Sequence, residues 1–517
     1  MASFTYSAKA DANGSSQIKV TETFSAPASK IVIDLTGDPI DYSADQKTNR
    51  FPILTVPAGD MPELSAFEFH PEATWATDLH FEIVDNGSTK TLCVVAAPMV
   101  KLLVSDTGTY NRDTGTTALK TDDPTADSPW SDGQWPHEGA DYLVIGSGMY
   151  LRTWSQYRLA PWTFPGRSLT IADGACFINL IADDLASAGI VANYRLAGGT
   201  LANAKSTDAH FLGTFEAVAG TTSRIEGGIS KKLYLQDGSL TGSGNLVFAG
   251  AGFNATEGTT ILDLDKSAFT GKIAVGLGFA ASDSKHELLR IGGSFGTALP
   301  AFAADGVDLG EYATIEATSP LTVAADSNRG VTVHDVVRFA PTVANPIVIE
   351  TPVVNNGTIR VTGDGALSLA GTMTSAANAA VSVEAGTLCL AGSGAVAGSK
   401  LVFAAGTKLE IALDSADAAL CATGIDLSAL DDPIALDASF GGKLPFTVVN
   451  AGAKENFTSA ILTCSAAAAD AVRAMLPTTI SLKGFVPAAV QERTDPTTGA
   501  VTFFVELARP GFLLQLR

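Results

Sequence analysis

The sequence has few charged residues, and most of its charge is negative. Charged side chains make up 17% of the 517 residues, below the roughly 25% of an average globular protein. The 54 acidic residues outnumber the 33 basic ones and give a formal net charge of −21. This excess repels nucleic acid and anionic membranes and helps to keep a β-rich protein in solution. We expect no nucleic-acid partner, and calcium binding by some carboxylates is the alternative interpretation of the acid excess.

Cysteine is scarce and widely spaced. The five cysteines are Cys93, Cys176, Cys389, Cys421 and Cys464. The nearest two lie 32 positions apart and no Cys-x-x-Cys occurs, which argues against a zinc knuckle or a redox pair. An odd, dispersed number does not indicate a disulfide framework, although one bridge stays open. Together with the lack of phosphate-binding or dinucleotide motifs, this leads us to expect no metal and no cofactor.

Long apolar runs are also absent. No stretch of about 18 uninterrupted apolar residues occurs, so we expect no transmembrane helix. The first residues, "MASFTYSAKADANGSSQ", lack a basic start followed by an apolar run, so no signal peptide is visible. If the protein is exported, this chain corresponds to the mature part with a start Met added. A cytoplasmic location is the alternative.

Short alternating strands are what the sequence does contain. In "GTLCLAGSGAVAGSKLVFAAGTKLEI" (386–411), pairs of apolar residues alternate with small or polar ones, and glycines separate the pairs. A strand of three to five residues buries little surface by itself. Stacked on an equivalent strand of the next coil, at a spacing of about 4.8 Å, it pairs its backbone and extends a continuous core. Glycine fits the corners because it adopts positive φ without a steric penalty.

An internal match supports this interpretation. The segments 233–250 and 388–405 align without gaps at an offset of 155 residues, and each places Leu-x-Leu ahead of Leu-Val-Phe-Ala. That offset corresponds to about seven units of roughly 22 residues, a length typical of solenoid repeats. We therefore predict an all-β fold built on a right-handed parallel β-helix. A β-sandwich with longer strands and hairpins is the alternative fold.

Composition divides the chain into four zones. The predicted domains are an N-terminal β domain (1–125), a Trp-rich cap or linker (126–165), a parallel β-helix (166–440) and a small α+β capping unit (441–517). Within the first zone, Asn-Gly in "DNGS" predicts a hairpin turn. In the last zone, "SAAAADAVRAML" predicts a helix that Ser465 caps and Pro477 ends, and "DPTTG" predicts a further hairpin turn.

Several segments of the middle zone resemble the passenger-associated repeats of autotransporter-type bacterial surface proteins. In that family, a strand pair is followed by a Tyr/Phe-x-Gly corner and a further strand that ends in Gly-Thr-Leu. The matching positions here are Phe269, Gly271, Gly386, Thr387 and Leu388. The resemblance implies a right-handed β-helix displayed outside the cell.

The C-terminal region departs from that family. Full-type members end in a membrane β-barrel, which needs at least about eight strands, and the last 77 residues here are too few for one. The chain is then either an excised passenger or one of the barrel-less secreted relatives. We favour the second interpretation because "GFLLQLR" has the pattern of a finished terminal strand.

Enzymatic β-helices exist, so the carboxylate pairs need consideration. A glycosidase requires two carboxylates about 5 to 10 Å apart. The adjacent pairs Asp122/Asp123, Asp183/Asp184 and Asp431/Asp432 point to opposite faces of a strand unless they lie on a turn. Asp263 and Asp265 share one face and form a better pair, although that face is equally compatible with solvent. We therefore predict no catalytic residue.

The aromatic zone is the most distinctive candidate surface. It contains four of the five tryptophans: Trp130, Trp135, Trp154 and Trp162. These rings either cap the open end of the solenoid or stack on sugar faces, with Asp132, His137 or Glu138 bonding hydroxyls. The expected function is a non-catalytic structural or adhesive role outside the cell, with glycans or other surface proteins as partners. The alternatives are a carbohydrate-active lyase or glycosidase and a glycan-binding module that uses this zone.

Overall fold

A computed structural model shows a mostly β protein whose chain divides into two compact units. One unit comprises Met1–Leu102 and His137–Leu143, and the other comprises Leu103–Pro136 and Val144–Arg517. The structure describes residues 4–11, 14, 15, 18–20, 25, 30–36, 49–69, 78–97, 100–103, 128–131, 135–137, 140–153, 161–179, 189–203, 208–227, 231–249, 257–276, 286–310, 312–391, 396–413, 425–450 and 456–510.

The N-terminal unit contains two four-stranded sheets around its own core. The first sheet has the order β2 (Gly14–Ser15), β1 (Phe4–Asp11), β4 (Ile31–Thr36) and β6 (Phe67–Phe69). The second has the order β3 (Ile18–Lys19), β5 (Asn49–Pro57), β8 (Thr89–Ala97) and β7 (Asp78–Asp85). Two short 3₁₀ helices are η1 (Ala58–Asp60) and η2 (Leu64–Ala66), and β9 (Val100–Leu102) pairs in parallel with the start of β10 (Asp141–Ile145).

The predicted "DNGS" hairpin is confirmed between β7 and β8. The strands pair antiparallel up to Asp85 and Lys90. Asp85 Oδ1 accepts a hydrogen bond of 2.8 Å from the backbone N–H of Gly87, whose φ is +83°. Glycine is needed at this turn position because other residues adopt positive φ only with strain. The turn joins β7 to β8, and Leu92 and Val94 of β8 are buried in the core of this unit.

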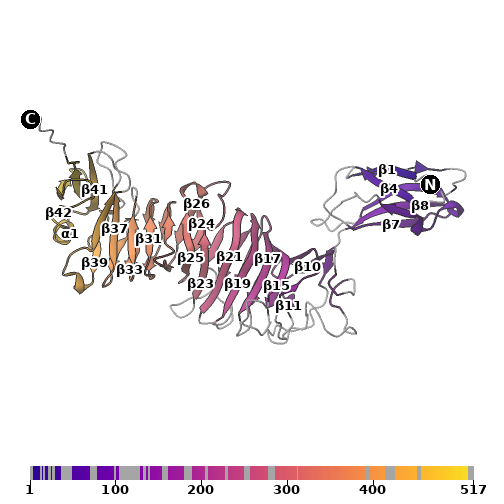
Figure 1. The fold of residues 1–517 in the computed structure, drawn as a ribbon, viewed down its shortest axis with the longest axis horizontal. Helices are drawn as coiled ribbons and strands as arrows, with labels where there is room; N and C mark the ends of the chain where they lie inside the picture. The colour runs from indigo at the N-terminus through magenta and orange to yellow at the C-terminus, as the bar shows by residue number, and fades with distance from the viewer. Residues whose placement is uncertain are drawn as a thin grey trace, which may run out of the picture. The chain divides into compact units, whose positions relative to one another are not determined.

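The second unit is a parallel β-solenoid, as predicted. Its coils stack so that each strand pairs in parallel with the strand of the next coil, from β15 to β37 and beyond (Figure 1). Two sheets line the solenoid, which we call the major sheet and the ten-stranded sheet. The ten-stranded sheet comprises β11 (Tyr150–Arg152), β14 (Cys176–Asn179), β16 (Thr200–Asn203), β18 (Thr222–Glu226), β20 (Asn245–Ala249), β22 (Ile273–Val275), β24 (Ala303–Leu309), β26 (Arg329–Val333), β29 (Val353–Asn355) and β32 (Met373–Ser375).

The major sheet changes its pattern along the solenoid. Up to β25 its main strands are long: β15 (Ile190–Ala197), β17 (Ala209–Ala217), β19 (Lys232–Gly242), β21 (Glu257–Phe269), β23 (His286–Gly293) and β25 (Thr314–Val323), preceded by β12 (Trp162–Thr163) and β13 (Ser168–Ala172). After β25 each coil has two short strands: β27 (Val336–Ala340), β28 (Ile347–Ile349), β30 (Thr358–Val361), β31 (Ala366–Leu369), β33 (Ala380–Val383), β34 (Thr387–Leu390), β36 (Lys400–Phe403), β37 (Lys408–Leu413), β39 (Ile434–Leu436) and β40 (Phe446–Asn450).

The change occurs within β25 itself. Its first part pairs with β27, through Ile315 and Phe339, and its last part pairs with β28, through Leu321 and Ile347. The single long strand that each coil contributes to the major sheet from β15 to β25 is therefore replaced by two short strands in the coils that follow. A short 3₁₀ helix, η3 (Ala325–Ser327), leads from β25 toward β26.

Inward-facing apolar residues stack from coil to coil, as the alternation predicts. In the long-strand half, Phe211, Leu235, Leu262 and Ile291 pair in succession and are each at most 1% exposed. In the short-strand half, Leu388 and Leu409 pair in the same way and are fully buried. The strands of the 386–411 segment show the expected alternation of buried and partly exposed positions. Because burial of a large apolar side chain stabilises by about 1.5–3 kcal/mol, this continuous stack is the main source of stability.

The Phe-x-Gly segment at Phe269–Gly271 forms a tightly packed corner between β21 and β22. A Cβ on Gly271 would lie 1.8 Å from the carbonyl oxygen of Gly244 in the preceding coil, so only glycine fits. Arg329 in β26 reaches the same corner. Its guanidinium donates to the carbonyls of Gly271 (2.7 Å), Phe269 (3.2 Å) and Thr297 (3.0 Å). The corner is thus joined to a coil further along the solenoid.

Parallel pairing begins before residue 166 and continues past residue 440. At the start, β11 pairs with β14 and β12 pairs with β15, so residues of the Trp-rich zone contribute strands to the solenoid. Near the C-terminus, β39 and β40 still pair in parallel with β36 and β37. A further five-stranded sheet has the order β35 (Val396–Ala397), β38 (Ile425–Leu427), β41 (Phe457–Cys464), β45 (Val501–Leu507) and β44 (Gln491–Thr494).

Antiparallel strands and the helix α1 (Ala469–Met475) close the C-terminal part. The "DPTTG" hairpin is confirmed: β44 and β45 pair antiparallel, and Asp495 Oδ1 accepts from the backbone N–H of Thr497 at 2.7 Å. The helix is shorter than predicted because residues 466–468 form turns. Ser465 Oγ caps that turn by accepting from Ala468 N at 3.2 Å. Smaller elements here are η4 (Ala438–Phe440), β42 (Thr479–Ile480) and β43 (Ala488–Ala489).

The internal match at an offset of 155 residues does not correspond to equivalent positions, so that interpretation was wrong. Its first copy places Leu246–Phe248 in β20 of the ten-stranded sheet, whereas its second copy places Leu401–Phe403 in β36 of the major sheet. The match arises because both sheets need the same alternation of inward apolar residues.

Among the described residues no helix is both long and apolar enough to cross a membrane.

Candidate functional site

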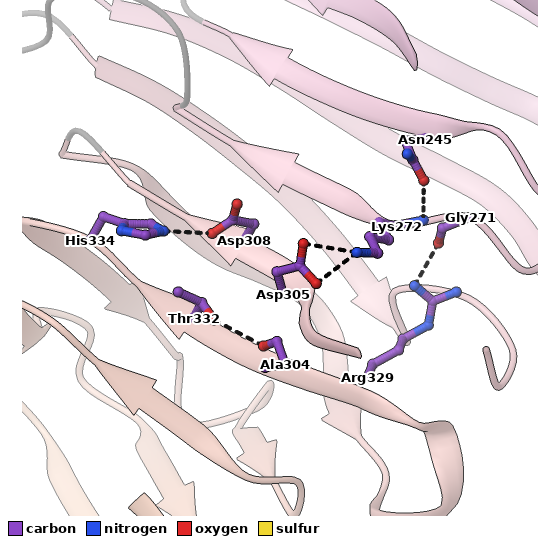
Figure 2. A network of polar contacts seen from close by, with 9 residues as sticks. All are labelled: Asn245, Gly271, Lys272, Ala304, Asp305, Asp308, Arg329, Thr332 and His334. Atoms are coloured by element: carbon purple, nitrogen blue, oxygen red, sulfur yellow. Dashed lines mark hydrogen bonds and ion pairs between the residues drawn. The ribbon is translucent and has the colours of Figure 1, made fainter. Parts of the chain in front are cut away.

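Four ionisable side chains gather on the outer face of the ten-stranded sheet: Lys272, Asp305, Asp308 and His334. We call them the charged cluster. Lys272 directly precedes β22, both aspartates lie in β24, and His334 directly follows β26. The cluster therefore spans three successive coils. Figure 2 shows the four side chains in a row across these strands.

One ion pair and one hydrogen bond join members of the cluster. Lys272 Nζ lies 2.7 and 2.8 Å from the two carboxylate oxygens of Asp305. His334 Nε2 lies 2.9 Å from Asp308 Oδ1. The neighbouring contacts in Figure 2 hold the backbone around the pairs: Asn245 Oδ1 accepts from Lys272 N at 3.1 Å, and Thr332 Oγ1 donates to Ala304 O at 2.9 Å.

Strand alternation places Asp308 on the outer face. Its neighbours Val307 and Leu309 are at most 1% exposed and point into the core. Successive residues of a strand point to opposite faces, so Asp308 points outward. Asp305 lies in the part of β24 where the register with β26 shifts, between Ala303 and Val307. This irregularity brings a second carboxylate to the same face only three positions away.

The two carboxyl groups have pKa values that move in opposite directions. The pKa of Asp308 is raised, chiefly by burial, and the charge and hydrogen bond of His334 oppose that shift. The pKa of Asp305 is lowered, chiefly by its hydrogen bond from Lys272. Relative to an ordinary aspartate, the ionised form is therefore favoured at Asp305 and the protonated form is favoured at Asp308. Such a divergence is the pattern found where one carboxyl group acts as an acid and another stays charged.

A pocket of about 150 Å³ opens beside the cluster. It is lined by Lys272, Asp305 and Asp308 together with Thr222 and Asn245. This volume is below the roughly 300–1,000 Å³ of pockets that enclose a drug-sized ligand, so it admits only a small group or one segment of a larger ligand. No group of three or more His, Cys, Asp or Glu residues able to hold a metal ion occurs in the described part of the chain.

The structure places the predicted carboxylate pairs in different surroundings. Asp263 and Asp265 lie on one exposed face of β21, as expected, and line a separate, larger groove. Asp431 and Asp432 are both exposed in the bend between β38 and β39, and Asp432 pairs with Lys400. The pairs Asp122/Asp123 and Asp183/Asp184 lie outside the described residues.

The four tryptophans differ in exposure. Trp130 is 1% exposed and its backbone bridges to Leu103, so its ring has no open face. Trp162 in β12 is half-buried, with its ring edge to face with Phe164 at a centroid distance of 6.1 Å. Trp135 is also half-buried, whereas Trp154 lies outside the described residues. Glycan stacking by these rings stays a prediction, and the burial of Trp130 favours a packing role for that residue.

Sequence reasoning missed the charged cluster. Its members lie 26 to 33 positions apart along the chain, between Asp308 and His334 and between Lys272 and Asp305. That spacing is about one coil, so knowledge of the coil register would have aligned them. The predicted repeat of roughly 22 residues is too short for this part of the solenoid.

Comparisons with known proteins identify no relative: no protein-family model, no curated protein and no solved structure matches this chain.

Proposed function

We propose that this protein is a non-catalytic β-solenoid with a structural or adhesive role outside the cell. The observation that supports this proposal is the use of outward polar side chains to link neighbouring coils. Arg195 pairs with Glu216 at 2.8 Å, and Thr214 Oγ1 donates to Asn193 at 2.7 Å. Similar pairs recur further along the major sheet, between Arg290 and Glu316 (2.9 Å) and between Arg360 and Glu384 (3.3 Å).

These pairs favour a rigid support rather than a catalytic face. Each pair is partly exposed and contributes little alone, about 0–1 kcal/mol. Repeated across successive coils, the pairs hold the outer strands in one arrangement. Their charges are also satisfied within the protein, which leaves them poorly suited to act on a substrate. Export and display on a surface are part of the proposal and follow from the family resemblance.

The test is a binding and turnover experiment on the full chain. The immobilised protein is exposed to a glycan array and to a panel of surface and matrix proteins. The same preparation is incubated with polysaccharides, and reducing ends and unsaturated uronate products are measured. We expect binding to at least one surface component without turnover. Sustained product formation would replace the proposal with an enzymatic function.

A carbohydrate-active enzyme is the second candidate, and the charged cluster favours it. Two carboxyl groups with opposed pKa shifts stand beside a histidine, a lysine and a pocket of about 150 Å³. In this function Asp308 would donate a proton and Asp305 would stay charged. If turnover is found, Asp308→Asn should abolish it, whereas Asp431→Asn should leave it unchanged.

A further inference from the structure

A groove of about 560 Å³ runs along β21 on the major sheet and is distinct from the charged cluster. One wall comes from β21, where Asp263 and Asp265 are exposed and Lys266 is buried. The opposite wall comes from β25, with Thr318 and Ser319, and Gly293 at the end of β23 lies between the two walls. Residues of three successive coils thus line one depression, which has both polar and apolar walls.

The groove exists because one coil lacks part of a strand. Pairing between β21 and β23 ends at Leu262 and Ile291, although β21 continues to Phe269. β23 itself ends at Gly293, and its pairing with β25 shifts between Ile291 and Gly293. The second half of β21 therefore has no β23 partner beside it, and the space is open to solvent.

Side chains already engage the backbone along this part of β21. Lys266 Nζ donates to the carbonyl of Leu264 at 2.9 Å. The backbone N–H of Ser267 donates to Asp265 Oδ1 at 2.9 Å, and Ser267 Oγ donates to Asp265 Oδ2 at 3.0 Å. An extended peptide that adds a strand needs free backbone groups at the edge. These contacts therefore argue against a peptide strand and favour a ligand recognised by side chains.

Lys266 is the most unusual group in the groove. The residue is 8% exposed, and burial lowers the pKa of its ammonium against the opposing charges of Asp263 and Asp265. Among the described residues, the Leu264 carbonyl is the one hydrogen-bond acceptor of an ammonium that has three N–H donors. The buried ammonium therefore keeps N–H groups for which the described residues supply no acceptor. A ligand oxygen in the groove can accept from them.

We propose that this groove binds a neutral, hydroxyl-rich saccharide. The carboxylates of Asp263 and Asp265 accept hydrogen bonds from sugar hydroxyls, and Lys266 donates to a sugar oxygen. The hydroxyls of Thr318 and Ser319 on the far wall act as either donor or acceptor. An anionic polysaccharide is disfavoured by the two carboxylates and by the net charge of −21. The inference rests on the proposed adhesive function and names its ligand class.

The test compares groove variants with a matched control on the full chain. Wild type is screened against immobilised neutral oligosaccharides of gluco, galacto and manno configuration, and the Kd of the best one is measured by calorimetry. Asp263→Asn combined with Asp265→Asn removes the acceptor charges, and Thr318→Trp fills the groove from an exposed position. The control is Asp431→Asn with Asp432→Asn, another exposed pair outside the groove.

We expect each groove variant to weaken saccharide binding at least tenfold and the control to change it less than twofold, with circular dichroism spectra that match the wild type. Wild-type binding that survives both groove variants overturns the inference but leaves the adhesive function intact. A wild type that binds proteins but none of the neutral saccharides also overturns it. Loss of binding to a basic peptide in the Asp263/Asp265 variant, with no saccharide binding, assigns the groove to a cationic protein partner instead.

Discussion

At the scale of single residues, Arg329 is the clearest case of a side chain that joins distant parts of the chain. It is 1% exposed, its pKa is lowered to about 10 by burial, and its guanidinium lies over the Phe269 ring at 5.6 Å. Its hydrogen bonds end on backbone carbonyls at Phe269, Gly271 and Thr297. A buried charge is tolerated here because several carbonyl dipoles surround it.

Replacing this residue should destabilise the solenoid strongly. Arg329→Met leaves the carbonyls of Gly271 and Thr297 without their donor, whereas the Phe269 carbonyl keeps its bond from the backbone N–H of Thr297. Each unsatisfied buried group costs about 1–3 kcal/mol. We expect the free energy of unfolding to fall by about 3 kcal/mol or more, measured by urea denaturation. Arg360→Met, at a half-exposed position paired with Glu384, is the control and should cost under about 1 kcal/mol. Equal effects of the two substitutions would contradict this role.

Two glycines should differ in the same way. Gly406 has a φ of +77° and open space where an added methyl group would lie, so Gly406→Ala should cost about 1 kcal/mol for backbone strain alone. Gly271→Ala should cost more because its methyl would meet the Gly244 carbonyl at 1.8 Å. Thermal melting of both variants checks the order. If the Gly271 and Gly406 variants had the same melting temperature, the backbone at Gly271 would accommodate the added methyl group at little cost.

At the scale of elements, the ion pairs between coils should make stability depend on pH. The pKa of Asp305 is lowered by Lys272, so the pair stabilises the folded state above the ordinary carboxyl value of about 3.9. That contribution is lost as the pH falls through the lowered folded value. Because both groups are partly exposed, the effect should stay below about 1 kcal/mol and weaken with salt.

The measurement compares the melting temperatures of wild type and Asp305→Asn from pH 7 to pH 2. Wild type should melt higher near neutral pH, and the difference should vanish in acid. Asp437→Asn is a useful contrast, because the pKa of Asp437 is lowered by Ser439 within its own turn rather than across coils. A pH-independent difference for Asp305→Asn would exclude this electrostatic origin.

The elements themselves were largely predictable. Alternation at Leu388/Leu390 and Leu401/Phe403 predicted strands whose inward residues are buried, and both hairpin turns were recognised from Asn-Gly and Asp-Pro. What could not be predicted was which sheet each strand joins. Both sheets of a solenoid require the same alternation, so Leu246–Phe248 and Leu401–Phe403 look alike and yet lie on different sides.

Whether a candidate site could be found depended on whether its residues share one strand or come from different coils. Asp263 and Asp265 were found because two positions along one strand always share a face. Asp308 and His334 were not found, because their proximity follows from the register between β24 and β26. The register in turn depends on coil length, which loops between the strands alter without leaving a regular sequence pattern.

At the scale of the whole molecule, the two compact units have separate cores and should respond separately to core substitutions. Ile53 in the N-terminal unit and Val381 in the solenoid are both fully buried. Ile53→Ala should cost about 3 kcal/mol, expose β5 and β8 to hydrogen exchange and leave β33–β37 protected. Val381→Ala should give the reverse pattern. Exchange that rises in both units for either variant would mean that they unfold as one cooperative body.

The division of β25 between two successors limits how this solenoid can be lengthened or shortened. Before it, a module of one long and one short strand repeats; after it, a module of three short strands repeats. One whole module on either side of β25 could be duplicated or deleted while the neighbouring coils keep their strand pairing. The same edit across β25 would place one long strand where two short strands are needed, so it would not preserve the strand pairing of the neighbouring coils.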